Sequence, residues 1–344
     1  MRRAVVLSAY RLCKTLGLFG LARRLTRSHL RILCYHGFVM DDEDRFRESL
    51  FVSREFLDRR MRYLADNGFR ILPLGEALDR LRDGTLPPDC VTITIDDGFH
   101  SVHAVARDVL ASHGFPSTLY LTSYYFQKGT PIFQLAVDYM CWKSGLETVD
   151  VSGLGIPALA GETNLQLTPE KRSWLSETVH AFGSDGLDEA GRVALARRLA
   201  ACLHVDYDRI ADSRILSLVT ADELRELEAS GMTIELHTHR HRFPEDPDKA
   251  ASELADNRAA IEPILGRKMD HFCYPSGRWS PEHQPVLAAN DVKSATTCES
   301  GLAHAGSNFL ALPRILDDNR VSQVEFEAEL TGFSELCRKV LGRA

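Results

Sequence analysis

The sequence predicts an α/β protein built on a parallel sheet or barrel, and three observations lead to this fold class. Over both ends of the 344-residue chain, short apolar segments rich in β-branched residues alternate with segments of helical spacing. Two of the apolar segments end directly on polar clusters, Asp96–Gly98 and His237–His241. Residues 127–215 break the alternation, so we interpret them as a long, partly helical insertion.

The elements before the insertion follow in a regular order. Ser53 is a good N-cap for the first helix, and Gly84 and Gly114 stand where the next two helices would end. Extended segments are expected at residues 31–36, 71–74, 90–95 and 116–122, and helices at residues 53–69, 75–84 and 101–113.

The alternation resumes after the insertion at Thr220, where Thr-Ala-Asp-Glu forms a capping-box pattern for a helix that ends at Gly231. Within the insertion, helices are expected at residues 169–182 and 187–203. Beyond it, strands are expected at residues 232–236, 271–274, 293–297 and 309–315, and helices at residues 246–265, 280–290 and 322–333.

The composition is that of a soluble globular protein, with 44% hydrophobic and 26% charged residues. A net charge of −7 argues against a nucleic acid as partner. The eight cysteines are scattered and form no Cys-x-x-Cys pair, which favours reduced thiols and a reducing compartment.

The N-terminal segment, residues 1–30, departs from this average because it is basic and amphipathic and carries no acid. Arg11 and Lys14 interrupt its apolar stretch too early for a secretory signal, and no run is long enough to span a bilayer. Such a helix suits peripheral contact with an anionic membrane, or packs on the protein's own body with a solvated basic face. We expect a cytoplasmic protein, in the first case resting on the inner membrane face.

The two polar clusters suggest a metal site. His237 and His241 are four residues apart, so a helical turn or a tight loop would bring both imidazoles to one side. Either Asp96 or Asp97 would add a carboxylate, and two imidazoles with one carboxylate suit Zn²⁺ or a similar ion. Both clusters follow predicted strands, and in parallel α/β folds the carboxyl ends of the strands face one site.

Two other metal-dependent classes do not fit. Metallo-β-lactamase-like hydrolases use His-x-His-x-Asp-His. Here position 240 is Arg and the next histidine, His241, comes one residue early. Barrel amidohydrolases carry His-x-His on the first strand, whereas this cluster lies deep in the chain.

Three motifs in order resemble those of the polysaccharide deacetylases, the NodB-homology or carbohydrate esterase family 4 group. Thr94–Gly98 resembles their Thr-Phe-Asp-Asp-Gly motif, and His237–His241 their His-Ser/Thr-x-x-His motif. Phe272–Gly277 is similar to the third motif in its Tyr-Pro-x-Gly form, found in members that act on exopolysaccharides. The resemblance implies a deformed (β/α) barrel as the catalytic domain, residues 31–335, interrupted by the insertion.

The resemblance also implies roles for individual residues. Asp97, His237 and His241 would hold a divalent metal, for which Zn²⁺ is the first choice, and Asp96 would be the general base that deprotonates the water on that metal. The backbone N–H of Ser276 would help to stabilise the oxyanion. The implied substrate is an acetylated amino sugar in a polysaccharide, an oligosaccharide or a lipid-linked glycan.

The sequence departs from the family pattern at two catalytic positions. The late Leu-x-His motif, which supplies a general acid in many members, has no histidine in the matching segment Leu312–Leu316. We therefore predict that His36, at the end of an early strand, is the general acid. The arginine of the usual third motif is also missing, with Cys273 in its place, and we expect Arg314 to supply this charge and to pair with Asp96.

Further side chains near the motifs are predicted to contact substrate or solvent. Tyr274, Arg278 and Trp279 lie in or just after the third motif, and an indole face stacks well on a sugar ring. His239 would point away from the metal if the backbone is extended there, so we assign it to substrate contact or to support of the site. Asp317-Asp318 is interpreted as a solvated turn.

The sequence therefore favours an N-deacetylase, with two alternatives. An O-acetyl esterase would keep the fold and need less protonation of the leaving group, which suits the absent late histidine. A catalytically silent sugar-binding module would not need a base beside a metal, so the complete Asp-Asp and His-x-x-x-His set argues against it.

Overall fold

The computed structural model describes residues 2–341, so Met1, the first residue of the predicted N-terminal segment, lies outside the described residues. The chain divides into two compact units. The first contains the residues up to Tyr124 and those from Ala221 onward, and the second is Tyr125–Thr220. The second unit covers nearly the same residues as the predicted insertion at 127–215.

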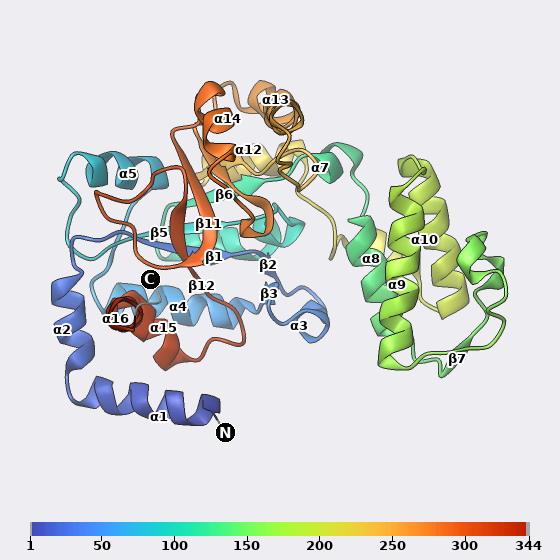
Figure 1. Cartoon of the computed structure of the whole chain (residues 1–344), viewed down its shortest axis with the longest axis horizontal. Coiled ribbons are helices and arrows are strands. Elements are labelled where there is room, and N and C mark those ends of the chain that lie inside the picture. Colours follow the sequence, from blue (N-terminus) through green and yellow to red (C-terminus); the bar gives the residue numbers. More distant parts are fainter. Residues whose placement is uncertain (1, 342–344) are drawn as a thin grey trace. The chain divides into compact units, whose positions relative to one another are not determined.

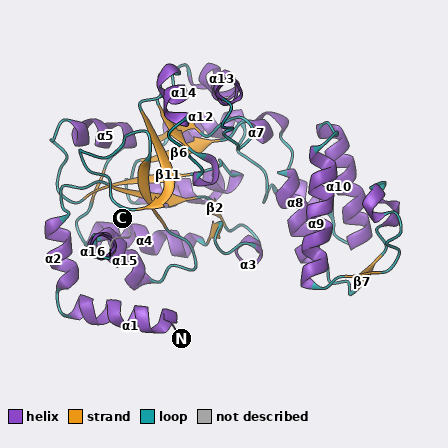
Figure 2. Ribbon diagram, viewed as in Figure 1, coloured by secondary structure: helices purple, strands orange, loops and turns teal. Residues whose placement is uncertain are grey.

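The first unit is a closed barrel of seven parallel strands, which confirms the predicted fold class (Figure 2). The ring is closed by the pairing of β1 with β5, and the short β4 (Arg70–Ile71) pairs with β5 outside the ring. In ring order the strands are β1 (Arg31–Tyr35), β12 (Leu312–Leu316), β11 (Ser294–Ser300), β10 (His271–Cys273), β9 (Met232–Leu236), β6 (Ser117–Leu121) and β5 (Cys90–Ile95).

The strands form where the sequence is apolar and β-branched, because a parallel barrel buries both faces of each strand. All residues of β1, β5 and β6 are buried, in runs such as Cys-Val-Thr-Ile-Thr-Ile in β5. Helices cover the outside of the ring (Figure 1). The strand side chains that point inward are buried and fill the ring. The continuous apolar runs that predicted these strands are the consequence of this two-sided burial.

The strand register brings the carboxyl ends to one rim. Tyr35 pairs with Ile95, and Leu121 pairs with Leu236. Leu236 in turn pairs with Phe272. The residues that follow these strand ends therefore meet at one end of the barrel, where the sequence places its polar motifs.

The helices of the first unit lie close to their predicted positions. Ser53 caps α4, with its hydroxyl accepting a hydrogen bond from the Phe56 N–H at 3.1 Å, and Ser322 and Glu325 form a capping box on α15. The helices are α1 (Arg2–Thr15), α2 (Leu18–Leu25), α3 (Glu43–Phe46), α4 (Arg54–Asp66), α5 (Leu74–Arg82), α6 (Arg107–Ser112), α12 (Ala221–Ala229), α13 (Pro247–Leu265), α14 (His283–Ala289), α15 (Gln323–Leu330) and α16 (Phe333–Val340). A separate pair of strands, β2 (Gly37–Phe38) and β3 (Phe51–Val52), follows β1.

Three local features differ from the prediction. The segment predicted as one helix at 101–113 begins with a π-helix, Val102–Ala106, before α6. The predicted closing helix at 322–333 is followed by a further helix, α16. The N-terminal segment is two helices, which break at Gly17 with φ of 78°.

The second unit is mainly helical. Its elements are α8 (Phe133–Lys143), β7 (Thr148–Val149), two 3₁₀ turns (Ser152–Leu154 and Pro157–Leu159), β8 (Leu165–Gln166), α9 (Pro169–Ser184), α10 (Glu189–Leu203) and α11 (Tyr207–Ser213). Three of its helices, α9, α10 and α11, are capped by a side chain that accepts a backbone hydrogen bond. The capping residues are Thr168, Asp188 and Asp206. The short α7 (Tyr124–Lys128) spans the boundary between the units.

Among the described residues, no single helix is long and apolar enough to cross a membrane. The pair Arg3–Thr15 and Leu18–Leu25 meets the length and composition criteria only when taken together, and it is bent by 78°.

One buried histidine gives the fold a pH dependence. Burial lowers the pKa of His271, at the start of β10, to about 4. Between pH 6.5 and 4 the unfolded chain therefore binds a proton that the folded chain does not, so this contribution to stability is lost as the pH falls. We expect it to reach about 3 kcal/mol, measured as the free energy of unfolding in urea for the wild type relative to His271→Gln.

The comparison with a variant is needed because of Glu235. Burial raises the pKa of Glu235 to about 7, so its contribution to stability is lost as the pH rises, opposite to that of His271. The exposed His304 provides the control, since His304→Gln removes an imidazole that the fold does not bury. A wild type and a His271→Gln variant with parallel stability curves would contradict the assignment.

Candidate active site

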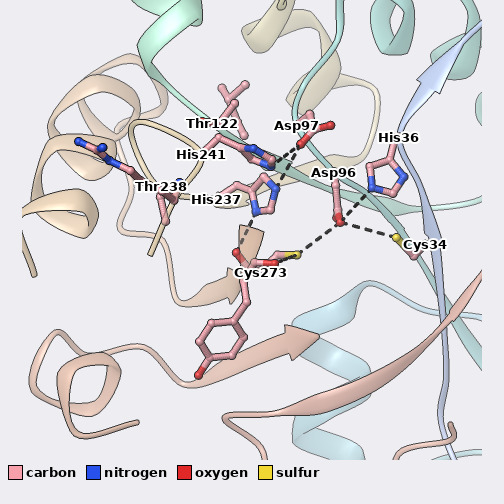
Figure 3. Close-up of polar contacts among 12 residues, drawn as sticks. Cys34, His36, Asp96, Asp97, Thr122, His237, Thr238, His241 and Cys273 are labelled. Atoms are coloured by element: carbon pink, nitrogen blue, oxygen red, sulfur yellow. Dashed lines mark hydrogen bonds and ion pairs between the residues drawn. The ribbon is translucent and has the colours of Figure 1, made fainter. Parts of the chain in front are cut away.

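The three predicted metal ligands meet at the rim of the barrel (Figure 3). Oδ1 of Asp97 lies 3.3 Å from Nε2 of His237 and 3.2 Å from Nε2 of His241. His237 is buried, but the His241 side chain is 42% exposed, so the group is open to solvent on one side. One carboxylate and two imidazoles in this arrangement fit a divalent cation with further positions left for water or substrate.

The orientation of His237 supports the role of a ligand. Its Nδ1 lies 2.8 Å from the Cys273 carbonyl oxygen, which can only accept a hydrogen bond, so Nδ1 carries the proton. Nε2, which faces Asp97, is then free to offer a lone pair. Burial would raise the pKa of Asp97, but the two imidazoles beside it, His241 first, hold that pKa well below its ordinary value.

The loops that carry the ligands are held in unusual backbone conformations. Asp97, Thr238 and His241 have φ of 70°, 64° and 53°, in the left-handed region that residues other than glycine rarely adopt. Each costs on the order of 1 kcal/mol or more, which the surrounding structure must offset. Gly98 has φ of 91°, which side chains rarely adopt, and a Cβ there would also collide with the side chain of Leu121.

A buried hydrogen-bond network fixes the loop after β9. The fully buried Asn257, on α13, accepts a hydrogen bond from the His237 N–H at 3.0 Å and donates to Oγ of Ser123 at 2.9 Å. Ser123 in turn lies 2.9 Å from Nδ1 of His239, and the Tyr124 N–H donates to the His239 carbonyl at 2.7 Å. The sequence analysis did not identify Asn257 or Ser123, because neither belongs to a motif.

This network favours one of the two roles predicted for His239, support of the site, over contact with a substrate. The residue follows a left-handed Thr238 instead of lying in extended backbone, and it is only 8% exposed. Its ring is directed to Ser123 and to the edge of Tyr124. His239 therefore supports the loop and does not present its ring to a substrate.

Asp96 lies on the other side of the strand end and has a different environment. Both of its oxygens accept hydrogen bonds from Arg314, at 2.8 Å and 2.7 Å, so the expected ion pair is present. Both side chains are buried. Burial by itself would raise the pKa of Asp96, but the charge and hydrogen bonds of Arg314 hold that pKa well below its ordinary value.

Two cysteine thiols also face Asp96. Sγ of Cys34 and Sγ of Cys273 lie 3.6 Å and 3.4 Å from its Oδ2. Burial raises the pKa of both thiols well above their ordinary value, so they are neutral and donate weak S–H hydrogen bonds to the carboxylate. In the sequence, Cys273 marks only the place of a missing arginine, and no pattern connects Cys34 with the site.

His36 follows β1 directly and lies beside the same carboxylate. Its Nε2 is 3.8 Å from Oδ2 of Asp96, and its side chain is 25% exposed. The imidazole is therefore within reach of both solvent and Asp96. This position is consistent with proton transfer at the open side of the site.

The third motif forms a turn at the end of β10. Ser276 is exposed with φ of 57°. Gly277 also has a positive φ, and a Cβ there would lie 2.6 Å from the Cys298 backbone nitrogen. Arg278 is exposed and Trp279 is half-buried, with its indole N–H donating to Glu299 at 2.9 Å, so a substrate role for these two stays a prediction.

Two other predictions near the site are wrong. Tyr274 is fully buried, and its hydroxyl donates to the Leu310 carbonyl at 2.9 Å, so the side chain packs in the core and does not reach a substrate. Asp317 is no solvated turn residue: it is 4% exposed and accepts hydrogen bonds from Arg60 and from the Tyr35 hydroxyl. Both errors have the same cause, because the packing that buries these polar groups comes from distant segments.

Comparisons with known proteins agree with this fold and these motifs. The family model described as Polysaccharide deacetylase matches residues 196–295, which include the histidine motif and the third motif but not Asp96 and Asp97. A segment of 93 residues is 32% identical to the Bacillus subtilis protein YxkH, a polysaccharide deacetylase by its name. This segment makes up 27% of the present chain and 31% of the length of YxkH.

Three solved structures share this fold, and two of them are described as deacetylases. The Streptococcus pyogenes deacetylase PplD, solved with acetate, is 18% identical, with a TM-score of 0.58 over 88% of this chain and 98% of its own. IcaB from Ammonifex degensii is 19% identical, with a TM-score of 0.55 over 88% and 97%. The BpsB deacetylase domain from Bordetella bronchiseptica is 15% identical, with a TM-score of 0.51 over 84% and 96%.

Fold and site together define a parallel (β/α) barrel with a histidine, histidine and aspartate cluster at the carboxyl rim. The comparisons confirm the resemblance of this chain to the polysaccharide deacetylase family.

The buried ion pair generates a stability prediction. Arg314→Met leaves the Asp96 carboxylate buried and unpaired, so we expect the free energy of unfolding to fall by about 3–5 kcal/mol at pH 7. The double variant Asp96→Asn, Arg314→Met removes both charges and should be more stable than the single Arg314→Met variant. Urea unfolding of the four proteins in the cycle measures the interaction energy.

The control for this cycle is an exposed ion pair, Lys268 with Asp291, where Lys268→Met should change the unfolding free energy little. If the double variant loses as much as the two single variants combined, Asp96 and Arg314 do not stabilise each other.

Proposed function

We propose that the chain is a metal-dependent hydrolase that removes N-acetyl groups from an amino sugar in a polysaccharide, an oligosaccharide or a lipid-linked glycan. The observation that carries this proposal is the pair of adjacent carboxylates with separate partners. Asp97 faces two imidazoles, and Asp96 faces Arg314 and His36. The family resemblance supports carbohydrate deacetylation as the class of reaction.

Asp97, His237 and His241 would hold the metal, with Zn²⁺ the first choice for nitrogen and oxygen ligands. When bound there, the ion supplies Lewis acidity toward an acyl carbonyl and toward water. The protein's own contribution is to fix the ligands. The Cys273 carbonyl holds His237 in one tautomer, and Asn257 holds the loop that presents both histidines.

Asp96 would accept the proton of the attacking water. Arg314 keeps it ionised and oriented, with Oδ2 toward His36. A carboxylate with so low a pKa is a weak base, so a proton that it accepts is readily passed on. His36, whose Nε2 is 3.8 Å from Oδ2 of Asp96, would deliver a proton to the leaving nitrogen. An amide requires this proton before its C–N bond breaks.

The third motif would stabilise the negative charge that develops on the acyl oxygen. The turn at Pro275–Gly277 is exposed at Ser276, whose backbone N–H is the predicted donor. The exposed Arg278 and the half-buried Trp279 follow it and would contact the sugar. The Tyr-Pro-x-Gly form of the motif supports an exopolysaccharide-type glycan as the substrate.

The metal prediction is tested by analysis of metal content together with acetate release. Wild-type protein should bind close to one divalent ion per chain and release acetate from N-acetylated oligosaccharides, while Asp97→Asn should lose both. Asp96→Asn should retain the metal and lose at least about 100-fold in rate, because it removes only the proton acceptor. His304→Gln is the control for a histidine outside the site, and a metal-free wild type with full activity would refute the proposal.

A second candidate function is an O-acetyl esterase, favoured by Arg314 at the place where the late histidine is expected. The two functions differ in how much the leaving group needs a proton. With His36 as general acid, His36→Ala should lower kcat on an N-acetyl substrate by about 100-fold or more and lower it far less on an O-acetyl substrate. Equal losses on both substrates would remove His36 from this role, and a wild type active only on esters would favour the second function.

A further inference from the structure

Helix α1 carries two apolar faces, and only one of them is packed. Leu7, Tyr10 and Cys13 pack with a buried cluster on α2, α15 and α16, and on the same side Arg3 and Lys14 pair with Glu325 and Glu327 of α15. The opposite face carries Val5 and Leu12, and Leu16 follows in the turn after the helix; these side chains, spaced by seven and four residues, are 66%, 60% and 66% exposed. An apolar stripe with helical spacing is therefore left in contact with solvent.

Helix α2 repeats this arrangement. Phe19 and Ala22 are 5% and 2% exposed and pack inward. Leu18, Leu21 and Leu25, spaced by three and four residues, are 38%, 54% and 62% exposed. The exposed side of α2 is thus a second apolar stripe, after the break at Gly17.

The C-terminal helix α16 adds a third element. Val340 and Leu341 are 86% and 66% exposed, and α16 lies beside α2 (Figure 1). Together the two helices form an apolar groove of about 360 Å³, lined by Leu18, Leu21, Ala22, Leu25, Phe333, Leu336, Cys337, Val340 and Leu341. We call this groove with the exposed faces of α1 and α2 the apolar platform.

Exposed apolar side chains are concentrated in the platform. Among the described residues, eleven large hydrophobic side chains are exposed, and all but Met40 and Trp142 lie on α1, on α2, in the turn between them or at the end of α16. A patch of this kind on a soluble protein marks a binding surface.

The charge around the platform indicates its partner. Residues 1–32 contain eight basic residues and no acid, although the whole chain carries a net charge of −7. Arg11, Arg24 and Arg27 are exposed on or next to these helices, and in the part of the chain that the structure describes none of them has a carboxylate partner. An anionic lipid surface offers both the negative charge and the apolar layer that this surface needs.

The helices are built to lie on a bilayer and not to cross it. With 14 and 8 residues, α1 and α2 are about 21 Å and 12 Å long, against a hydrocarbon core of about 30 Å. They meet at 78°, and the inner face of α1 is packed against α2, α15 and α16. Neither helix can therefore cross the hydrocarbon core alone, and each leaves an apolar side exposed to solvent.

We propose that the apolar platform docks the protein on an anionic membrane, with lipid acyl chains entering the groove between α2 and α16. Arg3, at the start of α1, donates to the Arg320 carbonyl, four residues after the end of β12. The start of α1 thus contacts the loop between β12 and α15. This docking does not depend on the proposed deacetylase activity, and vesicle binding tests it alone.

The experiment measures flotation of the full chain with vesicles made of equal parts phosphatidylglycerol and phosphatidylcholine, or of phosphatidylcholine alone. The wild type should partition to the anionic vesicles at least about tenfold better than to the neutral ones. Leu16→Asp with Leu21→Asp should lose at least about tenfold in partition to anionic vesicles, since it places charge in the apolar layer. Arg11→Gln with Arg24→Gln should reduce the preference for anionic lipid.

The matched control is Trp142→Asp, which makes the same kind of change at an exposed apolar side chain outside the platform and should bind like the wild type. Circular dichroism and thermal unfolding verify that each variant is folded. Absence of vesicle binding by the wild type, or undiminished binding by the leucine variant, overturns the proposal. So does a wild-type dimer in light scattering that the leucine variant dissociates without any vesicle binding, because a second copy would then occupy the platform.

Discussion

The pairing of β1 with β5 is the constraint on which the rest of the structure depends. It joins the first strand to the third long apolar segment of the chain and closes the ring of parallel strands. Closure removes the sheet edges and aligns Tyr35 with Ile95, so the residues that follow, His36 and Asp96, become neighbours. The site is therefore a product of strand register, and its side chains come from segments more than two hundred residues apart.

The two adjacent carboxylates show how one strand end can support two chemical tasks. Successive residues point in opposite directions, and here a left-handed Asp97 sharpens that division. Asp97 turns toward imidazoles that can share a cation with it, whereas Asp96 turns into the barrel toward a buried guanidinium and two neutral thiols. Burial acts against ionisation of both groups, and the positive charge beside each one outweighs it.

Much of the barrel can be predicted from the sequence, because two-sided burial of parallel strands produces continuous apolar runs and the helices have clear caps. The ligand residues can also be predicted, since motif spacing and strand ends are local features. The residues that support these ligands cannot be predicted in this way. Asn257, Ser123 and the thiol of Cys34 act through contacts across the fold that no local pattern records, and the burial of Tyr274 and Asp317 depends on distant packing. The break of the N-terminal segment at Gly17 and the added helix α16 also depend on tertiary contacts.

The left-handed residues of the site set a limit on how this protein can be improved. Asp97, Thr238, His241 and Ser276 each hold a conformation that glycine or asparagine would adopt at lower cost. A search for heat-resistant variants that ignores activity would therefore be drawn to these positions and would discard the chemistry first. Stability and function compete here over a few backbone angles, so the rim of this barrel is less stable than an unconstrained sequence would make it.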